Sequence, residues 1–452
     1  SGVALKVEKV KSSGTIYIRA NGLIDPATVN ITSADNVTYT FKDNNYGSLV
    51  IERDNIVIDG AGYMLQGTGS EIGLDLSFRS NVTIRNTKIK KFGYGVYLNH
   101  SMCNSIEGNI MAENSFESIR IYESSGNNIL KNNITATTWD GIVLYGSSNN
   151  NIVNNCLMSN YDGIRLYESS NNSIAENIVA NNYYGVFLAF SSGNIIAQNN
   201  IMANNGNGIS LCWSSNENRI VRNDITANDW FGIHINESSN NMIHHNNLLN
   251  NTNQVYTENS VNVWDDGMEG NYWSNYTGVD SDHDGIGDTP HVIDANNQDN
   301  HPLLGEFHSY HITHIEPGFT LTLVSNSSIS NFDVGVWIEH PENRIIHFYA
   351  AGETGYGFCR LCIPKNLTAP PYTVIIDNGE TPVLRYNETL YDNGTHRWIY
   401  FGYEHSTHEI EIIPEFPSAI IPPFLMVLSV IAVVFAKKNA KTEAQLPKFN
   451  FL

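Results

Sequence analysis

Three acidic residues stand at one phase of an internal repeat. Each copy has an anchor residue, an aliphatic residue, any residue and a second aliphatic residue. The anchors are Gly95, Ser118, Gly141, Gly163, Gly185, Gly208 and Gly232. Glu117, Asp140 and Asp162 directly precede three successive anchors. If each copy forms one coil of a stacked fold, neighbouring carboxylates lie about 4.8 Å apart, the spacing of adjacent strands.

This acidic column admits more than one chemistry. Carboxylates about 5 Å apart suit the two-carboxylate mechanism of a retaining glycosidase, and a row of like charges can also hold a cation. The alternative is a solvated surface where each carboxylate faces water. Glu117, Asp140 and Asp162 are therefore candidate catalytic residues of a polysaccharide lyase or glycoside hydrolase, and we favour binding over catalysis.

An aromatic column runs beside the acidic one, one position further back in the copies. Its members are Phe116, Trp139, Tyr161, Tyr183 and Trp230. Aromatic rings offer large apolar faces, which suit the faces of sugar rings, so the column predicts a glycan-binding surface. The alternative is that both columns lie at an exposed turn and pack only against each other.

A third candidate is an acidic loop. Carboxylates recur at Asp280, Asp282, Asp284 and Asp288, and Gly285 permits a sharp turn. Hard oxygen ligands at alternate positions are typical of a calcium loop, and Ile286 occupies the alternate position between the last two carboxylates. The loop lacks the distal Glu and flanking helices of an EF-hand. We expect a structural Ca²⁺ that ties the repeat region to the next domain; the alternative is an acidic surface turn.

Two spacings look like metal motifs but do not predict metal sites. His308, His311 and His314 are three residues apart, which groups side chains on a helix but not on the extended segment expected here. Cys359 and Cys362 form a lone C-x-x-C without a second pair. We expect all five cysteines to be structural or unpaired.

The remaining charged positions of the repeat predict no chemistry. Arg120 and Arg165, with Glu123 and Glu168, are expected to form surface ion pairs of small energetic effect. The sequence contains no P-loop, no H-E-x-x-H motif and no nucleophile elbow.

The period predicts the elements that position these residues. Anchors lie 22 to 24 residues apart, by subtraction of their numbers, a period typical of stacked repeats. Each copy has three short apolar segments, such as Ile129, Ile134 and Ile142–Leu144, without helical spacing. We therefore predict an all-β fold with a right-handed parallel β-helix over residues 46–262 and an N-terminal cap over residues 1–45.

Asparagine recurs at matching turns of the repeat. Its side chain tolerates left-handed backbone and can hydrogen-bond its counterpart in the next coil. These positions predict structural ladders rather than ligand contacts: Asn109, Asn132, Asn177, Asn199, Asn223 and Asn246.

Other domains are predicted after the repeat. Residues 263–305 form an Asp/Gly/Trp-rich segment with the calcium loop, and residues 306–413 alternate like the strands of an immunoglobulin-like β-sandwich. A linker at 414–418 precedes an apolar run without charge, predicted as a transmembrane helix at 419–437. Because lysines follow the run, residues 438–452 are predicted to be a cytoplasmic tail.

Composition constrains the partners. Asp and Glu number 46 against 25 Lys and Arg, a net charge of −21, which argues against nucleic acid because binding relies on basic residues at phosphates. Asn-x-Ser/Thr sequons lie inside and outside the repeats, which favours export and glycosylation. We expect an extracellular location with a C-terminal anchor in the cell membrane.

Several segments resemble the NosD-like family. They are Ile56-Val57-Ile58-Asp59-Gly60-Ala61-Gly62, the Asn-rich coils, and the stretch from Asn262-Val263-Trp264-Asp265 through Gly270-Asn271-Tyr272-Trp273-Ser274 to Gly285-Ile286-Gly287-Asp288-Thr289-Pro290. The resemblance covers residues 45–304 and implies a right-handed parallel β-helix within a wider group of carbohydrate-binding and sugar-hydrolysing β-helices. The family takes its name from a periplasmic protein linked to copper-site maturation of nitrous oxide reductase. The sequence shows no Cys/Met/His copper cluster, so that role is not carried over.

The end of the chain resembles another group. Pro414-Glu415-Phe416-Pro417, followed by the apolar run and lysines, is similar to the C-terminal tail of archaeal surface proteins. Together these features predict a cell-surface β-helix protein that binds glycans or other surface polymers and holds a structural Ca²⁺. Two alternatives stay open: a calcium-dependent polysaccharide lyase or glycoside hydrolase, and a self-assembling structural component of a surface layer or filament.

Overall fold

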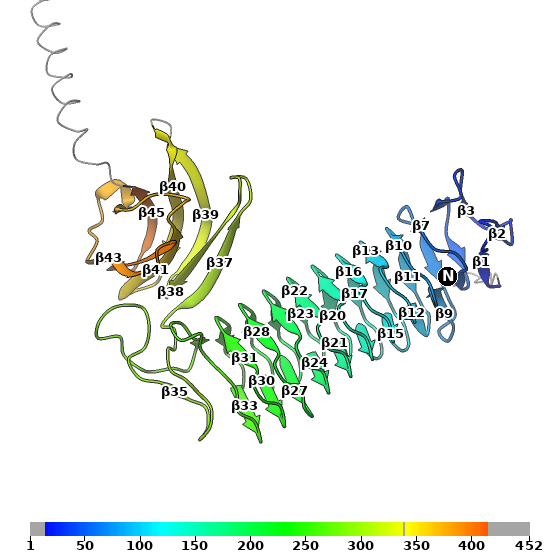
Figure 1. Ribbon diagram of the computed structural model, residues 1–452, viewed down its shortest axis with the longest axis horizontal. Coiled ribbons are helices and arrows are strands. Elements are labelled where there is room, and N and C mark those ends of the chain that lie inside the picture. Colours follow the sequence, from blue (N-terminus) through cyan, green and yellow to red (C-terminus); the bar gives the residue numbers. More distant parts are fainter. Residues whose placement is uncertain (1–13, 338–339, 415–452) are drawn as a thin grey trace, which may run out of the picture. The chain divides into compact units, whose positions relative to one another are not determined.

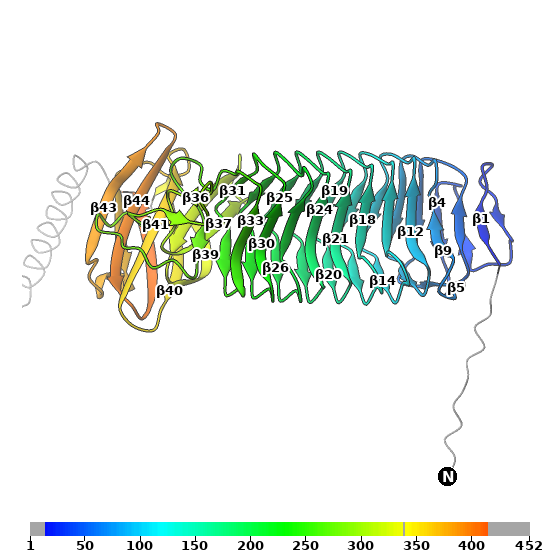
Figure 2. The same ribbon diagram turned by 90° about the horizontal axis from the view of Figure 1, so that it is seen from below.

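The computed structural model describes residues 14–337 and 340–414. The chain divides into two compact units between Ser309 and Tyr310. Strands of the first unit stack into a parallel β-helix, and strands of the second form antiparallel sheets (Figures 1 and 2). The predicted all-β class and right-handed parallel β-helix are confirmed.

Three sheets run along the β-helix. Sheet A consists, in spatial order, of β2 (Ile24–Asp25), β1 (Ile16–Ile18), β6 (Leu49–Ile51), β9 (Ile72–Asp75), β12 (Tyr94–Asn99), β15 (Ile119–Tyr122), β18 (Ile142–Tyr145), β21 (Asp162–Tyr167), β24 (Tyr184–Ala189), β27 (Ile209–Cys212), β30 (Phe231–Asn236) and β33 (Asn253–Glu258). Sheet B consists of β3 (Ile31–Thr32), β4 (Thr38–Phe41), β7 (Ile56–Asp59), β10 (Val82–Arg85), β13 (Ser105–Glu107), β16 (Asn128–Leu130), β19 (Asn151–Val153), β22 (Ser173–Ala175), β25 (Ile195–Ala197), β28 (Arg219–Val221) and β31 (Met242–His244). Sheet C consists of β5 (Asn45–Tyr46), β8 (Met64–Gln66), β11 (Lys88–Lys90), β14 (Ile110–Ala112), β17 (Asn133–Thr135), β20 (Cys156–Met158), β23 (Ile178–Ala180), β26 (Asn200–Met202), β29 (Asp224–Thr226), β32 (Asn247–Leu249) and β34 (Tyr272–Trp273).

Core packing and the close approach of neighbouring coils explain the repeated anchor-aliphatic-x-aliphatic motif. The two aliphatic residues of each copy point inward because alternate strand residues share a face, and Ile142 and Leu144 are fully buried. The anchor must be small because the next coil is close. A Cβ on Gly163 would lie 2.4 Å from Val179 Cγ1 and 2.7 Å from the carbonyl oxygen of Gly185. Ser118 is the one anchor of the repeat that is not glycine, and its hydroxyl is hydrogen-bonded to that of Thr137 at 2.7 Å.

Buried asparagines tie successive coils together. In the predicted ladder each Asn Oδ1 accepts the backbone N–H of its counterpart one coil earlier, as between Asn109 and Asn132 at 3.0 Å and between Asn223 and Asn246 at 3.0 Å. The ladder is confirmed. Two further asparagine ladders, represented by Asn127 with Asn150 and by Asn182 with Asn204, follow the same pattern.

The two ends of the β-helix core are covered differently. At the first end, β2 pairs antiparallel with β1, and β3 pairs antiparallel with β4. At the second end, the indoles of Trp264 and Trp273 are 1% exposed. Trp273 Nε1 donates to Asp299 Oδ2 at 2.8 Å, and Asp299 lies on β36 (Gln298–Asp299), which pairs with β35 (His291–Val292). The Asp/Gly/Trp-rich segment therefore closes the core.

The second unit contains two antiparallel sheets around a shared apolar core. One sheet has the order β37 (Glu306–Ile312), β38 (Phe319–Ser325), β41 (Tyr356–Pro364), β44 (His396–Glu404) and β43 (Arg385–Asp392). The other has the order β39 (Ser328–Trp337), β40 (His340–Ala351), β45 (Thr407–Pro414) and β42 (Tyr372–Ile376), and a 3-10 turn η1 covers Asp377–Gly379. The immunoglobulin-like assignment stays a prediction.

The described residues include no helix long and apolar enough to span a membrane. The predicted transmembrane helix at 419–437 and the tail at 438–452 lie outside the described residues, as does the linker beyond Pro414.

Candidate functional site

The acidic column lies on one edge of sheet A. Asp162 begins β21, while Glu117 and Asp140 stand two residues before β15 and β18. Backbone bonds join the three coils: the N–H of Ser118 donates to the carbonyl of Asp140, and that of Gly141 to the carbonyl of Asp162. Asp140 Oδ1 also accepts the backbone N–H of Asp162 at 3.1 Å. The structure therefore brings the three carboxylates together as the period predicted.

Arginines, rather than water, face these carboxylates. The side chains of Glu117, Asp140 and Asp162 are only 7%, 6% and 0% exposed. Arg120 Nη1 lies 3.2 Å from Glu117 Oε1. The guanidinium of Arg165 lies 3.1 Å from Asp140 Oδ2 and 2.7 Å from Asp162 Oδ2. The solvated-surface interpretation of the acidic column is therefore wrong.

The expected pairing of Arg120 with Glu123 and Arg165 with Glu168 is also wrong. Each glutamate directly follows its strand and has a left-handed backbone conformation, with φ of 44° and 50°. Its side chain therefore leaves the face on which the arginines lie. Glu123 instead pairs with His100, at 2.7 Å between Oε2 and Nε2.

Burial changes the protonation of the column. It raises the pKa of Asp162 to about 7, and repulsion by the Asp140 carboxylate adds to this while Arg165 opposes it. Burial also raises the pKa of Asp140 and of Glu117, against attraction by Arg165 and Arg120 respectively. Glu117 Oε2 and Asp162 Oδ1 are buried without a hydrogen-bond partner. Burial therefore favours the protonated forms of these groups.

A cleft of about 540 Å³ opens over this column on the outer face of sheet A. Its lining consists of Glu117, Arg120, Thr138, Trp139, Asp140, Val143, Tyr145, Tyr161, Arg165 and Tyr167. Asp162 is not part of the lining, because its fully buried carboxylate lies against Arg165. Glu117 and Asp140 therefore face a ligand space, whereas Asp162 acts on that space only through its neighbours.

The predicted aromatic column is exposed beside the cleft. Trp139, Tyr161 and Trp230 are 56%, 47% and 46% exposed. Neighbouring rings also touch: Phe116 meets Trp139 edge-on at 6.1 Å, and Tyr161 stacks on Tyr183 at 5.1 Å. The rings therefore pack against each other and also offer faces to solvent, and glycan binding by this column stays a prediction.

The far side of the cleft has a second aromatic stripe that sequence analysis missed. Tyr122, Tyr145 and Tyr167 stack in register, with ring centroids 5.3 Å and 5.0 Å apart. Phe190 and Trp213 continue the stripe. The signal was present in the repeat, since each of the three tyrosines stands four residues after its anchor.

The acidic loop gathers part of the expected ligand set. Ligand atoms of Asp280, Asp282 and Asp288 lie within 4.8 Å of one another. Asp280 accepts the backbone N–H groups of Asp284 and Gly285, both at 2.9 Å. Gly285 has φ of 88°, a left-handed conformation that favours glycine. Asp284 Oδ1 accepts the N–H of Ile286 at 2.8 Å instead of joining the three carboxylates.

The histidine triplet is not brought together. His311 Nδ1 bonds the hydroxyl of Thr320 at 2.9 Å, and His314 Nε2 bonds the carbonyl of Val334 at 3.1 Å. Cys359 and Cys362 both lie on β41 and form no disulfide. Because they are three residues apart on a strand, they point to opposite faces.

A family model described as "Periplasmic copper-binding protein (NosD)" matches residues 27–192 and 141–278. The two matches together cover more than half of the chain, so the chain belongs to the NosD family. No curated protein matches its sequence.

Several solved structures are similar to part of this chain. The periplasmic alginate epimerase AlgG has 18% identity and a TM-score of 0.38, over 55% of this chain and 72% of that one. The mannuronan C-5 epimerase AlgE6 A-module of Azotobacter vinelandii has 12% identity and a TM-score of 0.34, over 56% and 91%. DFA-IIIase from Arthrobacter chlorophenolicus A6, without its lid, has 14% identity and a TM-score of 0.33, over 50% and 62%.

The copper named in the family description can be tested against the side chains. Cu(I) favours thiolate and thioether ligands. The groups of metal-ligating side chains among the described residues are His244 with His245 and Asp266, and the acidic loop. Neither contains a cysteine, so neither offers the thiolate ligands of a Cu(I) site.

Proposed function

We propose that the outer face of sheet A binds a carbohydrate chain in the cleft over Glu117 and Asp140. The observation that carries this proposal is the cleft lining, where two aromatic stripes flank a row of paired carboxylates and guanidinium groups. Aromatic rings supply apolar faces, and the charged groups supply donors and acceptors for hydroxyl groups. Binding sites with a few placed polar groups among aromatic side chains are typical of small-ligand pockets.

The stacked coils suit a linear ligand. Aromatic residues recur on successive coils at the strand spacing of about 4.8 Å, so ring faces repeat along the helix axis beside the charged row. A polymer lying along that axis would meet aromatic residues on both sides of the charged row. We infer that the ligand is a polysaccharide or a glycan chain of a surface polymer rather than a monosaccharide.

Glycan-array binding with single variants tests the proposal. Trp139→Ala and Tyr145→Ala remove rings from opposite sides of the cleft and should weaken binding by about tenfold or more, since an aromatic stacking contact contributes on the order of 1–3 kcal/mol. Tyr391→Ala, which removes an exposed aromatic ring of the second unit, is the control. Binding that is unchanged in both cleft variants, or absent for every polysaccharide in the wild type, would contradict the proposal.

A polysaccharide lyase or glycoside hydrolase is the second candidate. It is favoured by the raised pKa of Glu117 and of Asp140, because a raised pKa makes a carboxyl better suited to act as a general acid. Opposing it, both carboxylates are paired with arginines that a substrate would have to displace or share. Turnover of a bound polysaccharide that is lost in Asp140→Asn, while binding is kept, would favour the enzyme.

We further propose that Asp280, Asp282 and Asp288, with Asp284 and Ile286 beside them, hold a Ca²⁺ ion. Support comes from the convergence of three carboxylates and from the oxygen-rich ligand set that calcium prefers.

We also propose an extracytoplasmic location, supported by the sequons and by the periplasmic description of the family. Anchoring through residues 419–437 and assembly into a surface layer stay part of this proposal as sequence-based expectations.

A further inference from the structure

Two consecutive histidines end the last strand of sheet B. His244 is the final residue of β31 and continues an outward column in register with Val221 and Ala197. His245 takes the turn position that left-handed residues such as Asn154 and Arg222 occupy in earlier coils, and its φ is 59°. Consecutive strand residues normally point to opposite faces. The left-handed turn brings both imidazoles to one side, with ring centroids 4.7 Å apart.

The coil that carries these histidines is the one covered by the chain beyond the repeat. Asn154 and Arg222 are exposed, whereas His244 and His245 are 8% and 7% exposed. Phe307 stacks on the ring of His245 at 4.3 Å. The covering segment thus places polar imidazoles in a buried space, where each nitrogen needs a partner.

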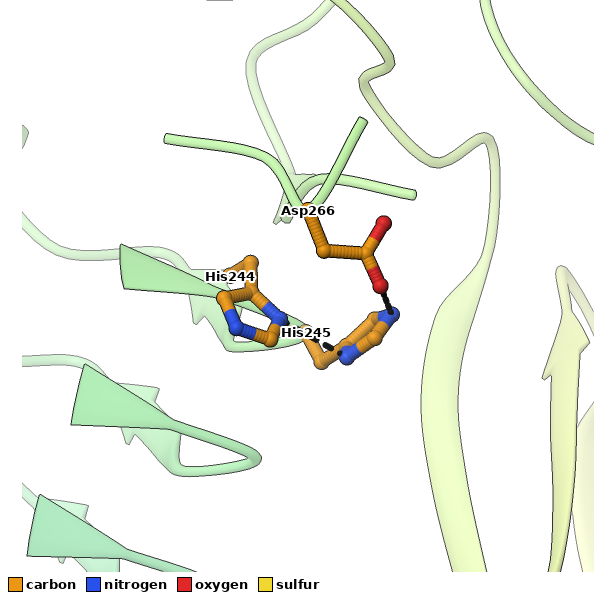
Figure 3. Close-up of side chains that lie close together, drawn as sticks. All are labelled: His244, His245 and Asp266. Carbon is orange, nitrogen blue, oxygen red and sulfur yellow. Dashed lines mark hydrogen bonds and ion pairs between the residues drawn. The ribbon is translucent and has the colours of Figure 1, made fainter. Parts of the chain in front are cut away.

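The same segment supplies two carboxylates to this space. Asp266 and Glu269 belong to one turn, in which Asp266 Oδ1 accepts the N–H groups of Met268 and Glu269. His245 Nε2 lies 3.1 Å from Glu269 Oε2 and 3.9 Å from Asp266 Oδ2. His244 Nδ1 lies 2.9 Å from His245 Nδ1 (Figure 3). Ligand atoms of His244, His245 and Asp266 therefore converge, and Glu269 bonds the same His245 nitrogen that Asp266 faces.

We propose that His244, His245 and Asp266, with Glu269 beside them, form a binding site for a divalent transition-metal ion, and that this ion is Zn²⁺. One ligand atom from each of His244, His245 and Asp266 lies within 4.8 Å of the other two. Ligand atoms around a tetrahedral Zn²⁺ are about 3.3 Å apart, given bonds of about 2.0–2.1 Å. The observed separations of 3.1 Å and 3.9 Å around His245 Nε2 bracket that value.

The mixed donor set selects the kind of ion. Imidazole nitrogen is a ligand of zinc and other transition metals, whereas Ca²⁺ and Mg²⁺ take oxygen ligands. The three carboxylates gathered in the acidic loop offer only oxygen donors, so the two candidate sites of this unit differ in the ions they prefer. An ion at the histidine site would join the last coil of the β-helix to the segment that closes its core. It would act independently of glycan binding in the cleft.

Isothermal titration of the chelator-treated full chain with Zn²⁺, in saturating Ca²⁺, tests this site. We expect one equivalent of Zn²⁺ to bind and to raise the melting temperature, because an ion bound only by the folded state stabilises it. Co²⁺ should bind at the same site and give the visible absorption of a low-symmetry, nitrogen-containing site. Ca²⁺ present in excess should not displace either ion.

Three variants are designed to keep the fold. His244→Val restores the residue type of Val221 in the column, His245→Asn places the residue best suited to left-handed backbone, and Asp266→Asn keeps the Oδ1 acceptor of its turn. Each should weaken Zn²⁺ binding at least about tenfold, while His100→Gln, at an exposed histidine far along the helix, should bind as the wild type does. Wild-type protein that binds no Zn²⁺, or variants that bind it undiminished, would overturn the proposal and leave a hydrogen-bonded histidine pair.

Discussion

Burial, rather than residue type, decides the behaviour of the acidic residues. Asp162 has no exposed surface and shares the Arg165 guanidinium with Asp140, whereas an exposed aspartate at the same place in the repeat would be fully solvated. Because burial penalises the charged form of Asp162 and the Asp140 carboxylate repels it, the pKa of Asp162 is raised to about 7. The charge of the acidic column therefore changes with pH near neutrality.

The pH dependence of stability tests this protonation. A folded-state pKa raised above the unfolded value stabilises the fold fully at low pH, and this contribution is lost as the pH rises through the folded pKa. The pKa of Asp162 is raised to about 7. Between pH 4 and pH 8 the melting temperature of the wild type should therefore fall by several degrees relative to that of Asp162→Asn. Thermal melts across this range measure the difference.

The control for this experiment is Glu176→Gln, which changes an exposed carboxylate of a nearby coil. Its melting temperature relative to the wild type should not vary with pH in the same way. A difference between wild type and Asp162→Asn that stays constant from pH 4 to pH 8 would mean that the fold does not raise the pKa of Asp162.

At the scale of elements, the asparagine ladders hold each coil to the next. Asn155 Nδ2 donates to the carbonyl of Ile129 at 2.8 Å, and its Oδ1 accepts the N–H of Asn132 at 2.9 Å. These groups are buried, so each unmade bond carries a desolvation cost. The ladders therefore fix the register of the sheets and, through it, the alignment of the cleft residues.

Asn155→Ala should destabilise the β-helix by about 1–3 kcal/mol, because it leaves buried partners of the ladder unsatisfied. Denaturant unfolding measures this change. The neighbouring Asn151→Ala removes an exposed asparagine and should change stability by no more than about 0.5 kcal/mol. Equal effects of the two substitutions would show that the ladder contributes nothing specific.

At the scale of the whole molecule, two units with separate cores share the chain. The β-helix core ends at the Trp264–Trp273 pair, and the second core lies between the antiparallel sheets. Units with their own cores often unfold as separate cooperative transitions. The proposed Ca²⁺ loop at Asp280–Asp288 belongs to the first unit.

Calorimetry should therefore resolve two transitions, of which chelation by EDTA lowers only one. The lowered transition should be the one that Asn155→Ala also lowers, which assigns it to the β-helix unit. Restoring Ca²⁺ should reverse the shift. Adding Zn²⁺ in a parallel sample shows how much of the shift comes from the histidine site rather than from the calcium loop. A melting profile unaffected by EDTA and Ca²⁺ would count against a structural calcium ion.

Sequence alone determined the stacking of the molecule. The Gly-aliphatic-x-aliphatic motif predicts the β-helix, the acidic column and the first aromatic column. In a solenoid, residues one sequence period apart lie next to each other on adjacent coils. The same count would have found the tyrosines four residues after the anchors. Local periodicity sufficed wherever the contact is between equivalent positions of adjacent coils.

Only the tertiary structure decided what surrounds those positions. The period gave no reason for Asp162 to be buried against Arg165, since burial depends on side chains packing across the sheet face. Nor could it bring Asp266 and Glu269 to His244 and His245, because the segment beyond the repeat folds back by contacts that follow no period. Stacked neighbours follow from the sequence period, whereas the burial of the cleft carboxylates and the assembly of the histidine site follow from tertiary packing.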